Sequence, residues 1–238
     1  MVAIGKLPGR AVCAGALILV LAGLAWKAGK EGISNFYVQS ANQEIKRWAT
    51  PGQRFRGDEG TRVMHYLTES LRYSPNNAWS LEEMGTFQLR RMHAATDPAL
   101  AIAAVRSANA HFHMTLIERP ASPFAWANLA LSKLYLDELD DELFAALRRA
   151  DELGPWEPEV QQSVLFVGLA AWHKLGTAQQ AAMVRTLERA VQRNATKVTE
   201  IVKSFSRLDL LCAINNSKLK IEDTCSRLQK SEPRSNRS

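Results

Sequence analysis

Residues that interrupt helices are scarce in this sequence of 238 residues. It contains 13 glycines and 9 prolines, and long runs of β-branched residues are rare, whereas alanine and leucine are abundant. With 46% hydrophobic and 23% charged residues, the composition is that of a folded globular protein rather than a disordered chain. Because helix-favouring residues predominate, we predict an all-α fold.

The motifs of common active sites are also missing. There is no glycine-rich phosphate loop and no Gly-x-Ser-x-Gly elbow. His111 and His113 are two residues apart and would point in different directions on a helix, so they cannot share a ligand. The acidic run LDELDDEL at 136–143 lacks the glycine-centred loop of an EF-hand and is more typical of a turn whose acids stabilise a helix start. We therefore expect no enzyme activity, no metal and no cofactor.

The charge gives little indication of a nucleic-acid partner. The net charge is +6, from 30 basic and 24 acidic residues, and much of the excess lies near the two ends of the chain. The basic pairs Arg90-Arg91 and Arg148-Arg149 have no aromatic residues interleaved with them, as nucleic-acid surfaces usually do. We expect no nucleic-acid binding.

One long uncharged run, AVCAGALILVLAGLAW, occupies residues 11–26. As a helix it would span about 24 Å, slightly less than the roughly 30 Å hydrocarbon core of a bilayer. Trp26 and the flanking lysines could cover the difference at the interface. We predict that residues 1–30 form a membrane anchor and that residues 11–26 contact the lipid bilayer.

Two other interpretations of this run stay open. A cleaved signal peptide has the same charged start and apolar centre, but Gly23 to Lys27 offers no small-x-small cleavage site. A buried soluble helix would need a polar face that the run lacks. The positive charges on the two sides do not decide the orientation. A short tail before a large domain usually leads to export of the domain, so we expect a single-pass protein whose soluble domain is extracytoplasmic.

Proline-containing turns divide the rest of the chain into helical hairpins. Pro120 and Pro155 are 35 residues apart, close to the period of about 34 residues of the tetratricopeptide repeat, and Pro75 begins a longer first unit. We predict an array of right-handed tetratricopeptide-like hairpins whose last pair forms a cap. The expected helices are 58–73, 77–92, 97–118, 123–136, 140–153, 157–174, 178–193 and 196–212.

Residue size along the hairpins follows the pattern of that repeat. Trp126 and Leu129 are three residues apart and would share a helix face, and Ala130 is small enough to let two helix axes approach. The pair Met84-Gly85 supplies the same large and small residues in the first unit. The other matching positions are Ala108, Phe112, Pro120, Ala150 and Pro155.

These features predict four segments. They are an anchor at 1–30, a connecting helix and linker at 31–57, a helical repeat domain at 58–212, and a basic tail at 213–238. Cys212 and Cys225 are thirteen residues apart, and an exported chain would permit a disulfide between them; two free thiols fit the sequence as well.

In arrays of helical hairpins, the first helices of successive pairs line a concave surface. We predict a partner-binding groove on that surface, although the same side chains could instead complete the core of so small an array. The candidate residues are Trp79, Glu82, Thr86, Phe124, Ala127, Leu131, Tyr135, Gln161 and Leu165.

Residues 122–176 also resemble one family. The blocks WANLAL, LDELDDEL, LRRADELGPWEP and GLAAW are similar to those of the VpsP family of bacterial polysaccharide-biosynthesis proteins, as is the order of anchor, repeat-like body and cysteine-bearing LLCAI at 210–214. The resemblance implies a non-catalytic, membrane-tethered adaptor or scaffold that binds other proteins of an exopolysaccharide biosynthesis and export machine. The alternatives are a scaffold or chaperone of another envelope assembly pathway and an enzyme whose site the sequence conceals.

Overall fold

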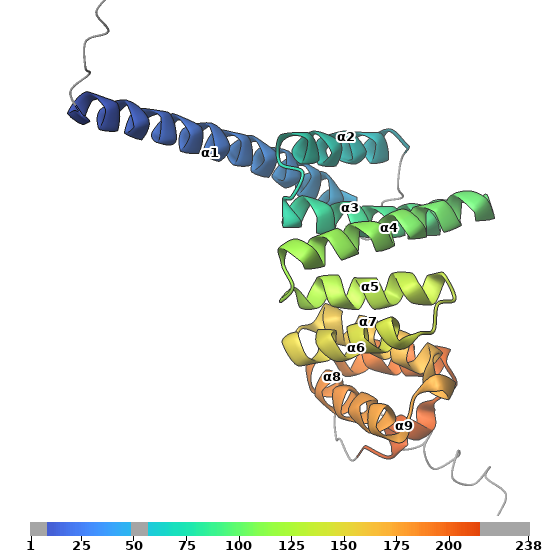
Figure 1. The fold of residues 1–238 in the computed structure, drawn as a ribbon. Coiled ribbons are helices and arrows are strands. Elements are labelled where there is room, and N and C mark those ends of the chain that lie inside the picture. The colour runs from blue at the N-terminus through green and yellow to red at the C-terminus, as the bar shows by residue number, and fades with distance from the viewer. Residues whose placement is uncertain (1–8, 49–56, 215–238) are drawn as a thin grey trace, which may run out of the picture. The chain divides into compact units, whose positions relative to one another are not determined.

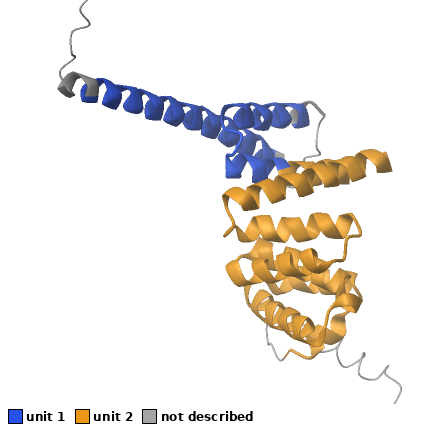
Figure 2. Ribbon diagram, in the orientation of Figure 1, with its two compact units in different colours: residues 1–84 blue, residues 85–238 orange. Residues whose placement is uncertain are grey.

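The computed structural model describes residues 9–48 and 57–214, and all the regular elements in these two ranges are helices (Figure 1). This confirms the predicted all-α class for the described residues. The chain forms two compact units, residues 1–84 and residues 85–238 (Figure 2). The boundary lies within one helix, between Met84 and Gly85, whereas the sequence predicted a single repeat domain over 58–212.

Unit 1 contains α1 (Gly9–Trp48), α2 (Gly57–Tyr73) and the first turns of α3 (Ala78–Ala94). The predicted anchor and the connecting helix after it are one unbroken helix, α1, and the predicted linker falls largely on residues 49–56, outside the described residues. The apolar half of α1 is exposed along its length, with Leu19 at 75% and Trp26 at 74%. By length and composition, α1 is suited to cross a membrane.

The second half of α1 packs along α2 (Figure 1). Its buried residues recur every three or four positions, as one face of a helix requires. Hydroxyl groups link the helices where small side chains let them approach: the Ser70 hydroxyl lies 2.8 Å from the Ser34 hydroxyl and 2.5 Å from that of Ser80. The buried apolar residues of this unit are Val38, Ala41, Ile45, Val63, Leu67, Leu81 and Met84.

Asn77, in the turn between α2 and α3, connects α3 to α1. Its side-chain amide donates to the Ser34 hydroxyl at 3.0 Å and to Asn35 Oδ1 at 3.1 Å, and its Oδ1 accepts hydrogen bonds from the backbone N–H groups of Trp79 and Ser80. Asn77 therefore caps α3 and also attaches it to α1.

We expect Asn77→Ala to lower the free energy of unfolding by about 1–2 kcal/mol, because it removes the cap and leaves buried polar groups unsatisfied. Urea titration of the full chain in detergent, followed by circular dichroism, measures this. Asn76→Ala changes an exposed neighbour in the same turn and should leave the midpoint nearly unchanged. Equal effects of the two substitutions would contradict the assigned role of Asn77.

Unit 2 continues from the rest of α3 with helices that follow one another in sequence order (Figure 1). From α4 onward, each α-helix packs on the next α-helix in the sequence, and α5 also packs on α7. The elements are α4 (Pro98–Glu118), α5 (Pro123–Tyr135), α6 (Asp141–Leu153), α7 (Pro158–Ala170), the short 3-10 helix η1 (Trp172–Lys174), α8 (Thr177–Ser204) and α9 (Leu208–Cys212).

Three of these helices begin where the sequence provides a start signal. Asp97, Ser122 and Asp140 cap α4, α5 and α6, each accepting a hydrogen bond from a backbone N–H of the first turn at 2.8–3.2 Å. Proline occupies the first turn of α4, α5 and α7, where its missing N–H costs nothing. The predicted boundaries of these helices are accurate for this reason.

The end of unit 2 differs from the prediction. The segment expected as a helix over 157–174 stops at Ala170 and continues as η1. The break expected between the helices 178–193 and 196–212 falls where it was predicted, at a kink in α8, but the second of these helices ends at Ser204 and α9 follows it. The kink is at Asn194, whose φ of −150° and ψ of 77° are not helical, and the break between α8 and α9 includes Ser206, whose φ is 55°.

The core of unit 2 depends on small residues where helices cross. A Cβ atom on Gly85 of α3 would lie 2.5 Å from the ring of Phe112 on α4, and Phe112 is fully buried. The absence of a side chain at Gly85 therefore lets the aromatic ring lie against the backbone of α3. Ala130 and Ala150 are also fully buried, as their small size in the repeat pattern predicted.

Candidate partner-binding groove

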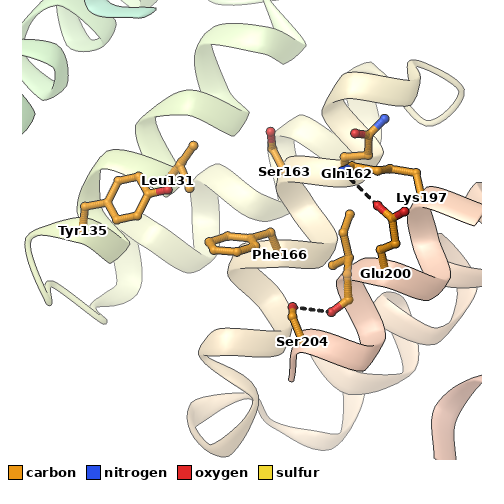
Figure 3. A pocket seen from close by; sticks show the side chains of 9 residues that line it. Leu131, Tyr135, Gln162, Ser163, Phe166, Lys197, Glu200 and Ser204 are labelled. Atoms are coloured by element: carbon orange, nitrogen blue, oxygen red, sulfur yellow. Dashed lines mark hydrogen bonds and ion pairs between the residues drawn. The ribbon is translucent and has the colours of Figure 1, made fainter. Parts of the chain in front are cut away.

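A hollow of about 420 Å³ opens on one face of unit 2. Three helices form it, and Phe166 of α7 lies between the α5 side chains and those of α8 (Figure 3). The residues that line it are Leu131 and Tyr135 from α5, Gln162, Ser163 and Phe166 from α7, and Lys197, Glu200, Ile201 and Ser204 from α8.

Helical spacing explains why these side chains meet. Leu131 and Tyr135 are four residues apart, as are Gln162 and Phe166, so each pair occupies one face of its helix. The α8 residues all follow the kink, where Asn194 Oδ1 accepts a hydrogen bond from the Lys197 N–H at 3.0 Å and so caps the second half of the helix. Val198 and Val202, on the opposite side of this half, are buried.

The floor of the groove is apolar and aromatic, and its polar groups largely satisfy one another. Phe166 also packs edge-to-face on Phe205, with ring centroids 5.2 Å apart. Lys197 forms a salt bridge with Glu200 at 3.2 Å, and the Ser204 hydroxyl donates to the Ile201 carbonyl at 2.7 Å. A surface of this kind suits an apolar or amphipathic segment of another protein.

Burial raises the pKa of Tyr135 above its ordinary value, so the phenol stays protonated at neutral pH and retains its hydrogen-bond donor. Its ring contacts the edge of the His93 ring, with centroids 5.6 Å apart. Tyr135 therefore offers an aromatic surface together with one polar group at the rim of the groove.

The nine predicted groove residues differ in location and in burial. Leu131 and Tyr135 line the hollow. Phe124 and Thr86 are half-buried, and Trp79 and Glu82 belong to unit 1.

Three of the predicted groove residues do not line an open surface. They are Ala127, Gln161 and Leu165, which are all buried at 2% exposure or less. Gln161 has a structural role, since its side-chain amide donates to the Pro155 carbonyl at 2.7 Å and holds the turn before α7.

The sequence analysis missed the α7 and α8 parts of the groove. On α7, the predicted positions were 161 and 165, whereas the hollow is lined by the half-buried positions 162 and 166, one residue further along the helix. On α8, the break expected between residues 193 and 196 coincides with the bend at Asn194, but no groove residue was predicted beyond it. The sequence does contain a signal for the bend, because asparagine is a common N-cap and Asn194 can cap the helical segment that follows it.

The acidic run at 136–143 surrounds a buried lysine. Lys133 Nζ lies 3.1 Å from Glu138, 2.9 Å from Asp140 and 2.7 Å from Glu142, and only 5% of the Lys133 side chain is exposed. Burial by itself would lower the pKa of Lys133, but the hydrogen bonds from these carboxylates raise it well above its ordinary value. The run thus forms the turn predicted from the sequence, with Asp140 capping α6.

Burial alone would raise the pKa of Asp140, but the Leu143 N–H and Lys133 lower it overall. In the described residues, no three His, Cys, Asp or Glu side chains are placed to hold a metal ion.

A second hollow, of about 560 Å³, lies between α6 and the first half of α8. It combines apolar side chains such as Phe144 and Met183 with the charged groups Arg148 and Glu152, which pair with each other at 3.2 Å. Ala178 is an exposed residue on its rim. This surface is less apolar than the groove.

Of the cysteines, Cys13 is a free thiol and Cys212 is disulfide-bonded. Cys225, the predicted partner of Cys212, lies outside the described residues, so the pairing remains a prediction. No known protein family and no curated protein matches this sequence.

Proposed function

We propose that this chain is a non-catalytic, membrane-anchored adaptor that acts in bacterial exopolysaccharide biosynthesis and export by binding other proteins of the machinery. In this proposal α1 spans the inner membrane once and the folded units lie in the periplasm. The helical hairpins of unit 2 act as a tetratricopeptide-like array whose inner surface holds the partner.

The observation that carries this proposal is the groove. Tyr135, Phe166 and Leu131 present a continuous apolar and aromatic surface across α5 and α7, and the second half of α8 closes its far side. Aromatic side chains held rigidly by a scaffold supply much of the affinity of protein interfaces. The floor has no cluster of lysine and asparagine that would select a peptide carboxylate, so the expected ligand is an internal segment with an apolar face.

The similarity to polysaccharide-biosynthesis proteins supports the choice of pathway. Residues 122–176, which carry that similarity, form α5, α6, α7 and η1. This segment supplies two of the three walls of the groove, including all of its aromatic side chains. If the resemblance reflects a shared function, that function resides in the part of the chain that builds the groove.

Site-specific photocrosslinking in native membranes tests the proposal. We expect p-benzoylphenylalanine in place of Tyr135 to crosslink to one defined protein, because the benzophenone would lie on the groove surface. The same residue in place of Ala178, in the second hollow, should give no such product. Ser163→Glu, which places a carboxylate in the apolar floor, should remove the crosslink and reduce secreted polymer while precursor synthesis continues.

Equal crosslinking from positions 135 and 178 would refute a specific groove. A defined partner from another envelope assembly pathway, with normal polymer secretion by Ser163→Glu, would retain the adaptor and overturn the pathway.

A further inference from the structure

The exposed apolar surface of α1 continues past the uncharged run. Ile33 is 42% exposed and Phe36 is 68% exposed, although Lys27, Lys30 and Glu31 come before them. The run at 11–26 is about 24 Å long, so a hydrocarbon core of about 30 Å would extend some four residues further, to about Lys30. Lysine side chains there can reach outward to the headgroups.

The α2–α3 turn meets α1 just beyond this level. Ser74 donates to Glu31 Oε1 at 2.7 Å, and Asn77 donates to Ser34 and Asn35 at 3.0 and 3.1 Å. These α1 residues begin one residue past Lys30 and end about 8 Å past it, at a rise of about 1.5 Å per residue. The headgroup layer on each side of a bilayer is about 5–8 Å thick. The turn is therefore at the depth of that layer.

Aromatic side chains lie on both sides of this turn in the sequence. Trp79, on the first turn of α3, is 61% exposed. Tyr73, at the end of α2, stacks on Tyr37 of α1 with ring centroids 5.9 Å apart, and the Arg72 guanidinium lies 4.8 Å from the Tyr73 ring centre. We call Phe36, Arg72, Tyr73 and Trp79 the aromatic collar.

We propose that the aromatic collar is a second membrane contact, seated in the lipid headgroup layer beside α1. Tryptophan and tyrosine favour this layer because their rings are apolar and their N–H and O–H groups reach water. The collar would hold unit 1 against the bilayer surface. This inference rests on the proposed insertion of α1, because only an inserted helix fixes the depth of the turn.

The charge around the collar indicates which lipids it contacts. Lys27 and Lys30 are near Glu31, and Arg72 forms a salt bridge with Glu69 at 2.7 Å. Because the charges nearly balance, the rings rather than a positive potential provide the attraction. The collar should therefore enter the headgroup layer with or without anionic lipid.

Fluorescent labels on the full chain in vesicles test the proposal. In a background with Cys13→Ala, Cys212→Ser and Cys225→Ser, single cysteines at positions 36 and 79 carry an environment-sensitive nitrobenzoxadiazole label. Gln43→Cys is the matched control, because it is exposed on the same face of α1 two turns further on. A fourth label, at Val20→Cys, reports insertion of α1. The vesicles contain phosphatidylcholine with and without phosphatidylglycerol. Lipids with a nitroxide at the headgroup quench the labels at 36, 43 and 79, and lipids with a nitroxide deep on the acyl chain quench the label at 20.

We expect the labels at 36 and 79 to be quenched several-fold more strongly than the label at 43, in both kinds of vesicle. If position 20 is quenched while positions 36 and 79 are quenched no more than position 43, the collar is overturned and the anchor stays intact. Contact of positions 36 and 79 with a second copy of the chain would have the same consequence. Absence of quenching at position 20 would overturn both the anchor and the collar. Uniform quenching at 36, 43 and 79 would also refute the collar, because no boundary would separate it from the rest of unit 1.

Discussion

Lys133→Met is expected to lower the free energy of unfolding by about 2–3 kcal/mol at neutral pH. The substitution keeps most of the apolar stem of Lys133 but leaves three carboxylates facing one another without a cation. Removing one partner of a fully buried ion pair costs about 3–5 kcal/mol, and the estimate here is lower because the carboxylates are roughly half exposed. Urea titration in detergent, followed by circular dichroism, measures the change.

The effect of Lys133→Met should depend on pH in a defined direction. The lowered pKa of Asp140 stabilises the native protein above the ordinary value of 3.8, and this contribution is lost as pH falls below it. The raised pKa of Lys133 stabilises the protein below 10.5, and this contribution is lost as pH rises beyond it. In the variant, acid protonates the crowded carboxylates and relieves their repulsion. The difference between variant and wild type should thus be smaller at acid pH than at neutral pH.

Lys197→Met provides a matched control for the buried lysine. Lys197 forms one salt bridge, to Glu200, and the side chains of both residues are at least half exposed. Such pairs contribute little, so we expect a loss below about 0.5 kcal/mol. A similar loss in both variants, or a Lys133→Met effect that grows as pH falls, would show that the three carboxylates do not depend on Lys133.

Gly85→Leu should be even more damaging, with an expected loss of about 3 kcal/mol or more, because overpacking a core forces side chains and backbone apart. The first added carbon would already lie 2.5 Å from the buried Phe112 ring. Gly85→Ala should cost less, about 1–2 kcal/mol, because alanine also gains roughly 1 kcal/mol of helix propensity over glycine.

A double-mutant cycle identifies the cause of the Gly85 effect. In a Phe112→Leu background, which removes the ring, Gly85→Ala should destabilise the protein much less than in the wild type, since residues in contact are not additive. Gly168→Ala is the control. The atom nearest its added carbon is the sulfur of Met183, part of a flexible side chain that can move aside. Full additivity of the Gly85 and Phe112 changes would contradict direct packing.

The comparison between sequence and structure shows which features local chemistry determines. Helix starts were predicted well because Asp97, Ser122 and Asp140 cap their own chains within a few residues. The continuity of α1 was not predicted. The charges at Lys27, Lys30 and Glu31 end the apolar run and suggested the end of a segment, but the helix continues through them. The kink in α8 depends on a single residue, Asn194.

The groove was predicted only in part because the burial of a helical residue depends on its neighbours. Leu131 and Tyr135, two of the predicted residues, line the hollow. A shift of one residue rotates a helical side chain by about 100°, which is enough to exchange the buried Gln161 and Leu165 for the accessible Gln162 and Phe166. The role of Lys133 was missed because a single lysine among apolar residues does not reveal how many acids will fold around it.

The unbroken α1 also has a mechanical consequence. A continuous α-helix is stiff to twisting and to compression, and this one runs from its lipid-suited half directly into hydroxyl contacts at Ser34 that hold α2 and α3. Any rotation or piston movement imposed on its first half would reach unit 1 without loss at a hinge. If α1 spans a membrane as proposed, the direction in which α2 and α3 face around the helix axis is set by which of its side chains face the lipid.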